Sequence, residues 1–334
     1  MPGLYLILIL TISYLLTGSF RKYSLANQIL DMPNHRSAHK VPTPRGGGLV
    51  FVIIFLLSLL VLFTVKLVTL SDMLSLLISG ILIASIGFLD DRQGVSAKKR
   101  LLVHFASCSL ALLLVGGMPA IEIGSLKLTS VVFTNLLAVF YLVWLLNLYN
   151  FMDGIDGIAA SEAIFCCCGA AIIYYLQGNG PAMILPLVLA GTVAGFLIWN
   201  FPPARIFMGD AGSGFLGLVL GVFSIQAATV NPDYLWSWLI LLGVFIVDAT
   251  MTLLRRALNK ENLAEAHNSH AYQHAARYYG SHLKVTLAVV FINALWLLPL
   301  AILVSDKLIN GLLGVLIAYI PLVILALKYQ AGKK

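Results

Sequence analysis

Aspartates recur in pairs or beside glycines at three places near the ends of apolar stretches. Asp90 and Asp91 are adjacent, Asp153 and Asp156 stand in Asp-Gly-Ile-Asp-Gly, and Asp210 stands between glycines in Met-Gly-Asp-Ala-Gly. Carboxylates close to hydrocarbon are costly unless they bind a cation or pair with bases, and hard oxygen ligands are those that Mg²⁺ prefers. The pattern predicts a catalytic site in which these aspartates bind a divalent metal or accept a proton.

Each acidic motif also has a structural interpretation. Asp90 and Asp91 can cap a helix end and pair with Arg92 and Lys98, while Asp210 suits a helix N-cap. The Asp-Gly-Ile-Asp-Gly segment can be a plain turn that breaks a helix. Two asparagines placed shortly before it, Asn147 and Asn150, add polar groups to the same face and favour a site over a turn.

Basic and histidine side chains accompany the acids. The segment Asp31–Gly48 combines three prolines and a glycine triplet with His35, Arg36, His39, Lys40 and Arg45, so it offers donors and close backbone for a phosphate. His267, His270 and His274 recur at helical spacing and are expected to line one face. Zinc is not expected, because no cysteine or His-Glu-x-x-His pattern accompanies them. An ordinary basic loop and a solvated helix are the alternatives.

The elements that must position these residues are membrane helices. Sixty per cent of the 334 residues are hydrophobic and 10% are charged, and the mean hydropathy is +0.95, which is typical of an all-α polytopic membrane protein. Ten spans result if a weak pair is re-entrant, and eleven if each apolar stretch crosses. The stretches are about 1–20, 47–65, 72–89, 101–118, 130–148, 158–176, 182–199, 213–230, 235–254, 285–304 and 308–327.

The orientation follows from the basic residues. Eighteen of the 21 lysines and arginines fall in one set of alternate loops and at the C-terminal end. Positive charge marks the cytoplasmic side, so the N-terminus is expected outside, in the periplasm, and the C-terminus inside. The net charge of +7 indicates topology and contact with anionic membrane lipids, and no nucleic-acid partner is expected. The single membrane domain, 1–334, then has cytoplasmic loops at about 21–46, 90–100, 149–157, 200–212 and 255–284.

Five segments together resemble the polyprenyl-phosphate N-acetylhexosamine-1-phosphate transferase superfamily, which includes MraY and WecA. They are DMPNHRSAHKVPTPRGGG, GFLDDR, NLYNFMDGIDG, RIFMGDAGS and HNSHAYQH. The resemblance runs from about Asp31 to His274 and implies an MraY-like helical architecture in a bacterial inner membrane, with the active site on the cytoplasmic face. It also implies an enzyme in which undecaprenyl phosphate attacks the β-phosphate of a UDP-N-acetylamino sugar, releasing UMP and leaving an undecaprenyl-pyrophosphoryl sugar.

The resemblance also suggests roles for single residues. Asp210, with Asp90 or Asp91, would hold Mg²⁺, or Mn²⁺ in its place, on the pyrophosphate. Asp153 and Asp156 would organise the nucleotide or the surroundings of the metal. Asp156 is also a candidate metal ligand. Asp90 is the favoured proton acceptor, and a covalent aspartyl-phosphate route stays open. The candidate substrate-binding residues are Arg45, Lys98, Arg100, Asn147, Asn150, His267 and His270, of which Arg45, Lys98 and Arg100 would receive the lipid phosphate.

Two departures from the superfamily pattern bear on the substrate. Arg100 stands where MraY has lysine, which keeps the charge but changes its geometry, and HNSHAYQH replaces a triple histidine. The second departure points to the WbpL branch, which starts O-antigen chains on sugars such as N-acetylfucosamine, N-acetylquinovosamine or N-acetylglucosamine. A homodimer remains open. A proton-coupled transporter is disfavoured because charges near mid-span are almost absent, Asp248 being the closest case.

Overall fold

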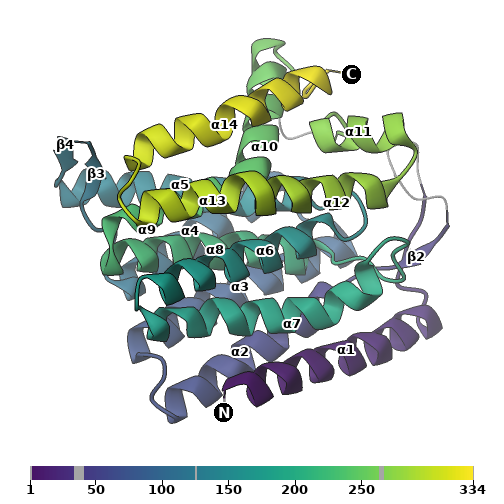
Figure 1. Ribbon diagram of the computed structural model, residues 1–334. Helices are drawn as coiled ribbons and strands as arrows, with labels where there is room; N and C mark the ends of the chain where they lie inside the picture. The colour runs from purple at the N-terminus through teal and green to yellow at the C-terminus, as the bar shows by residue number, and fades with distance from the viewer. Residues whose placement is uncertain (1, 34–40, 125, 263–266, 334) are drawn as a thin grey trace.

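The computed structural model describes residues 2–33, 41–124, 126–262 and 267–333. Apart from two short hairpins the chain is helical, and the all-α prediction is confirmed. The long helices lie side by side in one bundle (Figure 1). In chain order, the helices are α1 Pro2–Ala26, α2 Gly48–Thr64, α3 Leu70–Gln93, α4 Ala97–Val115, α5 Val131–Phe151, α6 Ile158–Leu176, η1 Gly180–Met183, α7 Ile184–Asn200, α8 Asp210–Val230, α9 Pro232–Leu241, α10 Gly243–Leu258, α11 Ala271–Tyr279, α12 His282–Ile292, η2 Asn293–Leu297, α13 Leu298–Ser305 and α14 Gly311–Lys328.

Every apolar stretch of the sequence falls largely on one helix or on two or three consecutive helices. Within the described ranges, eight helices are long and apolar enough to cross a membrane, or up to nine if the bent pair of α9 and α10 is one span. Helix α2 is apolar but has only 17 residues. The number of crossings and the orientation of the termini stay predictions.

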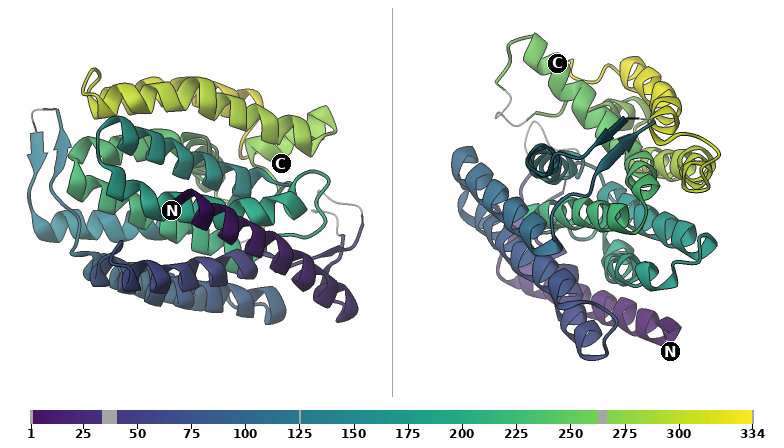
Figure 2. Two further views of the ribbon diagram at one scale, coloured as in Figure 1. Left: turned by 60° about the horizontal axis from the view of Figure 1, so that its bottom comes forward. Right: turned by 90° about the vertical axis from the view of Figure 1, so that its left-hand side faces the viewer.

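Two hairpins mark opposite ends of the bundle. Strands β1 (Leu30–Asp31) and β2 (Thr43–Pro44) pair antiparallel at the end where α11 lies (Figure 1). Strands β3 (Ile121–Ile123) and β4 (Leu126–Leu128) pair at the other end, where they project beyond the helices (Figure 2). The end that carries β1 and β2 is called the site end below, because the predicted aspartates gather there.

Helix α8 lies at the centre of the bundle and packs against α2, α3, α5 and α9. Glycines let the neighbouring backbones come close: a Cβ on Gly217 would lie 2.7 Å from the Leu145 carbonyl oxygen. Small residues at helix contacts are a general means of close packing in membranes. This packing fixes the first turn of α8 relative to the last turn of α3 and the last turn of α5.

The connection between α9 and α10 bends the chain by 69° at Leu242. Helix α10 therefore leaves the direction of α9 and carries Asp248 and Arg255 toward α11. Asp248 is 6% exposed, and its two carboxylate oxygens accept the amide hydrogens of Ala271 and Tyr272 at 2.9 Å each. This carboxylate satisfies two of the amides that a helix start leaves unpaired and ties α11 to α10.

Candidate active site

The centre of the candidate site is a cluster of two carboxylates around one guanidinium nitrogen. Arg45 Nη2 lies 2.6 Å from Asp91 Oδ1 and 2.8 Å from Asp210 Oδ1. The backbone brings Arg45 there, because Phe207 N donates to the Pro44 oxygen and Gly48 N to the Met208 oxygen. The Asp91 and Asp210 charges raise the pKa of Arg45 against the opposing effect of its own burial, so this cation is strongly held.

Asp91, rather than Asp210, satisfies the amides at the start of α8. Asp91 Oδ1 accepts from Asp210 N at 3.1 Å and Asp91 Oδ2 from Ala211 N at 3.4 Å, while the N-cap residue is Gly209. The interpretation of Asp210 as the N-cap is therefore wrong. A Cβ on Gly87 would lie 2.6 Å from Asp210 backbone atoms, so the close approach of α3 to α8 at this point requires glycine.

Asp90 faces a second arginine. Its Oδ2 pairs with Arg100 Nη1, its Oδ1 accepts from Val95 N at 2.6 Å, and Arg100 Nη1 also lies 3.5 Å from Asp210 Oδ2. The alternative that the two acids pair with Arg92 and Lys98 is wrong. The Arg92 guanidinium lies over the Phe88 ring instead, and the Lys98 side chain is exposed.

A cavity of about 530 Å³ opens beside this cluster. It brings together eight of the predicted site residues, and its remaining wall is largely apolar. The predicted residues in its lining are Asp90, Arg100, Asn147, Asn150, Asp153, Asp210, His267 and His270. The remaining predicted residues are absent from the lining as far as the chain is described, although Arg45 pairs with Asp210, which is part of it. They are Arg45, Asp91, Lys98 and Asp156.

The Asp-Gly-Ile-Asp-Gly segment breaks the helix as predicted, since α5 ends at Phe151 and α6 begins at Ile158. Tyr272 Oη donates to the Phe151 carbonyl oxygen at 2.9 Å, which fastens the break to α11. Asp153 follows and lines the cavity. Burial, followed by the Asp210 charge, raises the pKa of Asp153 well above its ordinary value, so this carboxyl holds a proton more readily than an exposed aspartate does.

Asp156 points elsewhere. Its Oδ2 accepts from Ala204 N at 3.0 Å, its Oδ1 lies 3.2 Å from His282 Nδ1, and its backbone oxygen accepts from Thr286 Oγ1 at 2.9 Å. These contacts join the break after α5 to the 201–209 connection and to α12. The roles of Asp156 as catalytic residue and metal ligand stay predictions, and its contacts indicate a positioning function.

The histidines do not share a helical face, and that expectation is wrong. His267 and His270 precede α11, which begins at Ala271, and their rings stack with centroids 4.9 Å apart. His274 lies on α11, with Nε2 3.2 Å from the Lys333 oxygen. Burial, with contributions from His270 and Arg256, lowers the pKa of His267 to about 3, so its imidazole is neutral at pH 7 and suits hydrogen bonds to neutral groups.

Sequence reasoning missed two polar residues of the lining and one buried acid. His104 and Gln273 line the cavity; His104 stands one helical turn after Arg100, a spacing that could have revealed it. Glu162 lies fully buried in α6 and accepts from Asn293 Nδ2 at 2.6 Å. It is a second acid inside a predicted span, besides Asp248.

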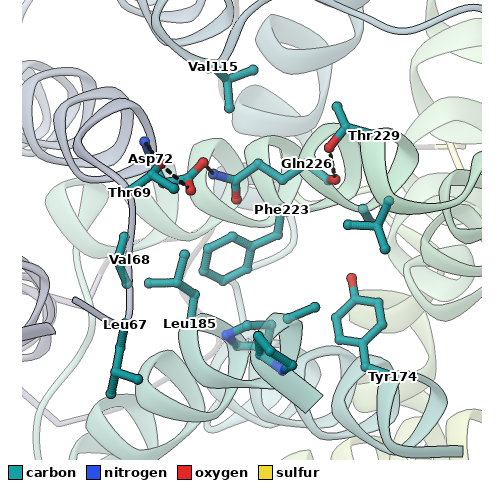
Figure 3. A pocket seen from close by; sticks show the side chains of 15 residues that line it. Leu67, Val68, Thr69, Asp72, Val115, Tyr174, Leu185, Phe223, Gln226 and Thr229 are labelled. Atoms are coloured by element: carbon teal, nitrogen blue, oxygen red, sulfur yellow. Dashed lines mark hydrogen bonds between the residues drawn. The ribbon is translucent and has the colours of Figure 1, made fainter. Parts of the chain in front are cut away.

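A second cavity, of about 310 Å³, lies at the opposite end of the bundle (Figure 3). Phe223 and Leu185 point into it, and Asp72 is the one charged side chain of its lining as described. Asp72 is engaged by Gln226 Nε2 at 2.7 Å and by Thr69 Oγ1 at 2.6 Å. With an engaged acid and no cation in its lining as described, this cavity is unsuited to phosphate groups.

The acid cluster fits a metal that takes few ligands from the protein. Among the described residues, no three His, Cys, Asp or Glu side chains are arranged to hold an ion by themselves. Asp91 and Asp210 nevertheless converge on one positive nitrogen, which is an arrangement that two carboxylates adopt around a cation. Mg²⁺ is usually held by one or two carboxylates together with substrate phosphates and water, so Asp210 and Asp91 suit it better than a metal that needs a complete protein shell.

Comparison with known proteins identifies the family of the chain. Residues 73–228 match the model of glycosyl transferase family 4. A Bacillus subtilis protein described as a probable undecaprenyl-phosphate N-acetylglucosaminyl 1-phosphate transferase is 27% identical over 329 residues, covering 96% of this chain and 90% of the relative.

Two further relatives are similar over a shorter range. The decaprenyl-phosphate N-acetylglucosaminephosphotransferase of Mycolicibacterium smegmatis is 33% identical over 235 residues, which cover 65% of this chain and 58% of the relative. The phospho-N-acetylmuramoyl-pentapeptide-transferase of Streptococcus pyogenes is 30% identical over 233 residues, covering 65% of this chain and 67% of the relative. On this evidence of shared sequence, the chain belongs to the polyprenyl-phosphate N-acetylhexosamine-1-phosphate transferase superfamily.

Proposed function

We propose that the protein transfers an N-acetylamino-sugar 1-phosphate from a UDP-sugar to undecaprenyl phosphate. An oxygen of the lipid phosphate forms a bond to the β-phosphorus of the UDP-sugar, and the bond from that phosphorus to the oxygen of the α-phosphate breaks. UMP leaves with the electron pair of the broken bond. The product is an undecaprenyl-pyrophosphoryl sugar, the first lipid-linked sugar of an O-antigen or a related surface polysaccharide.

The observation that carries the proposal is the composition of the 530 Å³ cavity. One part of its wall is charged, with Asp90, Asp210 and Arg100. The adjoining part is apolar and is formed by Ile83, Ile86, Leu101 and Leu146. A phosphate on a hydrocarbon chain needs both kinds of wall within a few ångströms, because its head requires donors and its chain must leave water.

The residues of the chain supply positioning and charge. Arg100 is placed to donate to a phosphate oxygen, and its guanidinium geometry suits bidentate contact. His267, neutral at pH 7, and Asn150 suit hydroxyl or amide groups of the donor. Asp153 is the better proton acceptor for a lipid phosphate that still carries one, since both oxygens of Asp90 are engaged by Arg100 and by Val95 N.

Mg²⁺, with Mn²⁺ as a substitute, is proposed to sit on Asp210 and Asp91, where it would neutralise charge on the transferred phosphates. Arg45, which pairs with both carboxylates, is then the residue that must turn away or share them. An Arg45 side chain released from these carboxylates would be able to donate to the lipid phosphate. The reaction is proposed to occur on the cytoplasmic face of a bacterial inner membrane, in keeping with the basic loops of the site end.

The test uses purified protein, undecaprenyl phosphate, Mg²⁺ and a panel of radiolabelled UDP-N-acetylhexosamines that includes the N-acetylglucosamine, N-acetylfucosamine and N-acetylquinovosamine donors. We expect UMP and a labelled lipid from at least one donor. Asp210→Asn should lower kcat by about 100-fold or more, as for loss of a group that stabilises developing charge. Asp72→Asn, in the cavity at the other end, is the matched control and should keep its activity. If no donor releases UMP, or if both variants behave alike, the proposal is wrong.

A further inference from the structure

The segment Tyr329–Lys333 folds back onto the residues that carry the cavity histidines. Gly332 N donates to the Ser269 carbonyl oxygen at 2.7 Å, and Arg255 Nη1 donates to the Ala331 carbonyl oxygen at 2.8 Å. Ala331 is 3% exposed. We call this set of contacts the clasp. It joins three parts of the chain that are distant in sequence: α10, the segment before α11 and the residues after α14.

Gly332 is fitted closely into the clasp. Its φ of +76° lies in the left-handed region that favours glycine. A Cβ there would lie 2.8 Å from the Thr252 carbonyl oxygen and 2.9 Å from Arg255 Cβ. The nearest of these atoms belongs to the backbone of α10 and cannot move aside cheaply, so any side chain at this position must push the segment off α10 and off Ser269.

Ser269 connects the clasp to the residues that line the cavity. Its carbonyl oxygen is held by Gly332, while its hydroxyl lies 3.0 Å from His267 Nδ1. His267 and His270, the residues on either side of Asn268 and Ser269, both line the cavity. On the far side of the segment, Asp248 holds the amides of Ala271 and Tyr272. The position of both imidazoles thus depends on a short stretch that is held at Ser269 and again at Ala271 and Tyr272.

We propose that the clasp is a positioning device for the donor substrate, with Gly332 and Arg255 as positioning residues that act through Ser269 on His267 and His270. The inference rests on the proposed function, since it takes the UDP-sugar as the ligand that the two imidazoles meet. The catalytic cluster of Asp90, Asp210 and Arg100 comes from α3, α4 and α8. The clasp therefore affects capture of the donor and leaves the charged groups around the phosphates in place.

The experiment compares Gly332→Val with Gly178→Val. Gly178 has a similar φ of +72°, but nothing lies within 4 Å of its added Cβ, so it reproduces the backbone strain without the displacement of a neighbour. A second pair, Arg255→Met and Arg255→Lys, separates the donated hydrogen bond from the packing of the side-chain stem. Each variant is purified in detergent. We measure KM and kcat for the UDP-sugar, the apparent melting temperature, and hydrogen exchange of a peptide covering 267–280.

For Gly332→Val and Arg255→Met we expect KM for the donor to rise about tenfold, with kcat within about twofold of the parent, as for lost ground-state binding. Hydrogen exchange of the peptide should quicken in both. Gly178→Val and Arg255→Lys should resemble the parent in KM and in exchange. A general loss of structure would instead lower the melting temperature and kcat together.

The outcomes separate the clasp from the proposed reaction. If the parent is active and Gly332→Val changes neither KM nor exchange relative to Gly178→Val, the clasp does not position the histidines and the inference is wrong. If exchange quickens in Gly332→Val while the parent releases no UMP from any donor, the clasp contacts stand and the proposed function fails. Equal changes in Gly178→Val and Gly332→Val would also overturn the inference.

Discussion

Arg45 stands where a cation would be expected between two carboxylates, and its removal tests that geometry directly. In Arg45→Gln, Asp91 and Asp210 lose the shared nitrogen at 2.6 and 2.8 Å. A hydrogen bond to a charged group contributes about 1.5–3 kcal/mol, and two such bonds are lost. The Arg45 side chain is 34% exposed, so solvent screening reduces this sum. We expect a net loss of about 2 kcal/mol, or roughly 3 °C in apparent melting temperature for a chain of 334 residues.

Mg²⁺ should reverse this loss, because the variant leaves two carboxylates facing one position without a cation. A ligand at 100 times its Kd adds about 2.7 kcal/mol of stability, which is enough to offset the change. The parent should gain less from Mg²⁺, since Arg45 competes for the same oxygens. The assay is the apparent melting temperature of purified protein in EDTA and across a Mg²⁺ titration, so it needs no substrate and no turnover.

Arg92→Gln is the matched control, because that guanidinium lies 5.0 Å over the centre of the Phe88 ring only one residue after Asp91. It should melt within about 1 °C of the parent, as expected for a surface substitution, and should show the parent's response to Mg²⁺. The reasoning is refuted if Arg45→Gln melts like the parent in EDTA, or if Mg²⁺ stabilises both arginine variants equally.

Three further results are expected. The fold raises the pKa of Asp153, so the stability that this carboxyl contributes is present below its unfolded pKa of about 3.9 and is lost as pH rises through the raised value. The melting temperature of Asp153→Asn should therefore exceed that of the parent by a margin that grows from about pH 4 upward. A difference that does not depend on pH contradicts this. Gly87→Ala forces α3 away from the Asp210 backbone and should lower kcat by about 100-fold. Gly214→Ala is the control: its Cβ would meet Ile83 at an ordinary contact distance of 3.4 Å, so kcat should stay within about threefold of the parent value. Asp156→Asn should leave the Mg²⁺ concentration for half-maximal activity unchanged while Asp210→Asn raises it, and an equal rise in both variants would assign Asp156 to the metal.

The positions of the long helices and the break between α5 and α6 could be predicted from local sequence, whereas the 69° bend at Leu242 lies inside the predicted stretch 235–254 and was not predicted. Apolar stretches of about 20 residues indicate segments that lie in lipid as helices. The glycines after Asp153 and Asp156 indicated the break between α5 and α6. The gathering of acids at one end followed from the same pattern. These features depend on neighbours within a few residues, which is the range over which sequence periodicity carries information.

The partners of single side chains could not be predicted, because they come from distant parts of the chain. Asp91 meets amides 119 and 120 residues further on, and nothing in the adjacent Asp-Asp pair distinguishes its role from that of Asp90. The prediction that the histidines share one helical face was wrong for a related reason. Their spacing fits a helix, but Asp248 of α10 holds the amides of Ala271 and Tyr272 and so sets the helix start after His270.

The bend between α9 and α10 constrains how the length of this region can change. Removing one residue between Leu242 and Asp248 would turn the carboxylate by about 100° around α10 and shift it by about 1.5 Å. It would then miss the first amides of α11, and the segment that carries His267 and His270 would lose this contact with α10. An insertion in the β3–β4 hairpin, which projects from the far end of the bundle (Figure 2), disturbs no such register. Tolerance to insertions and deletions should therefore differ sharply between the two ends of the molecule.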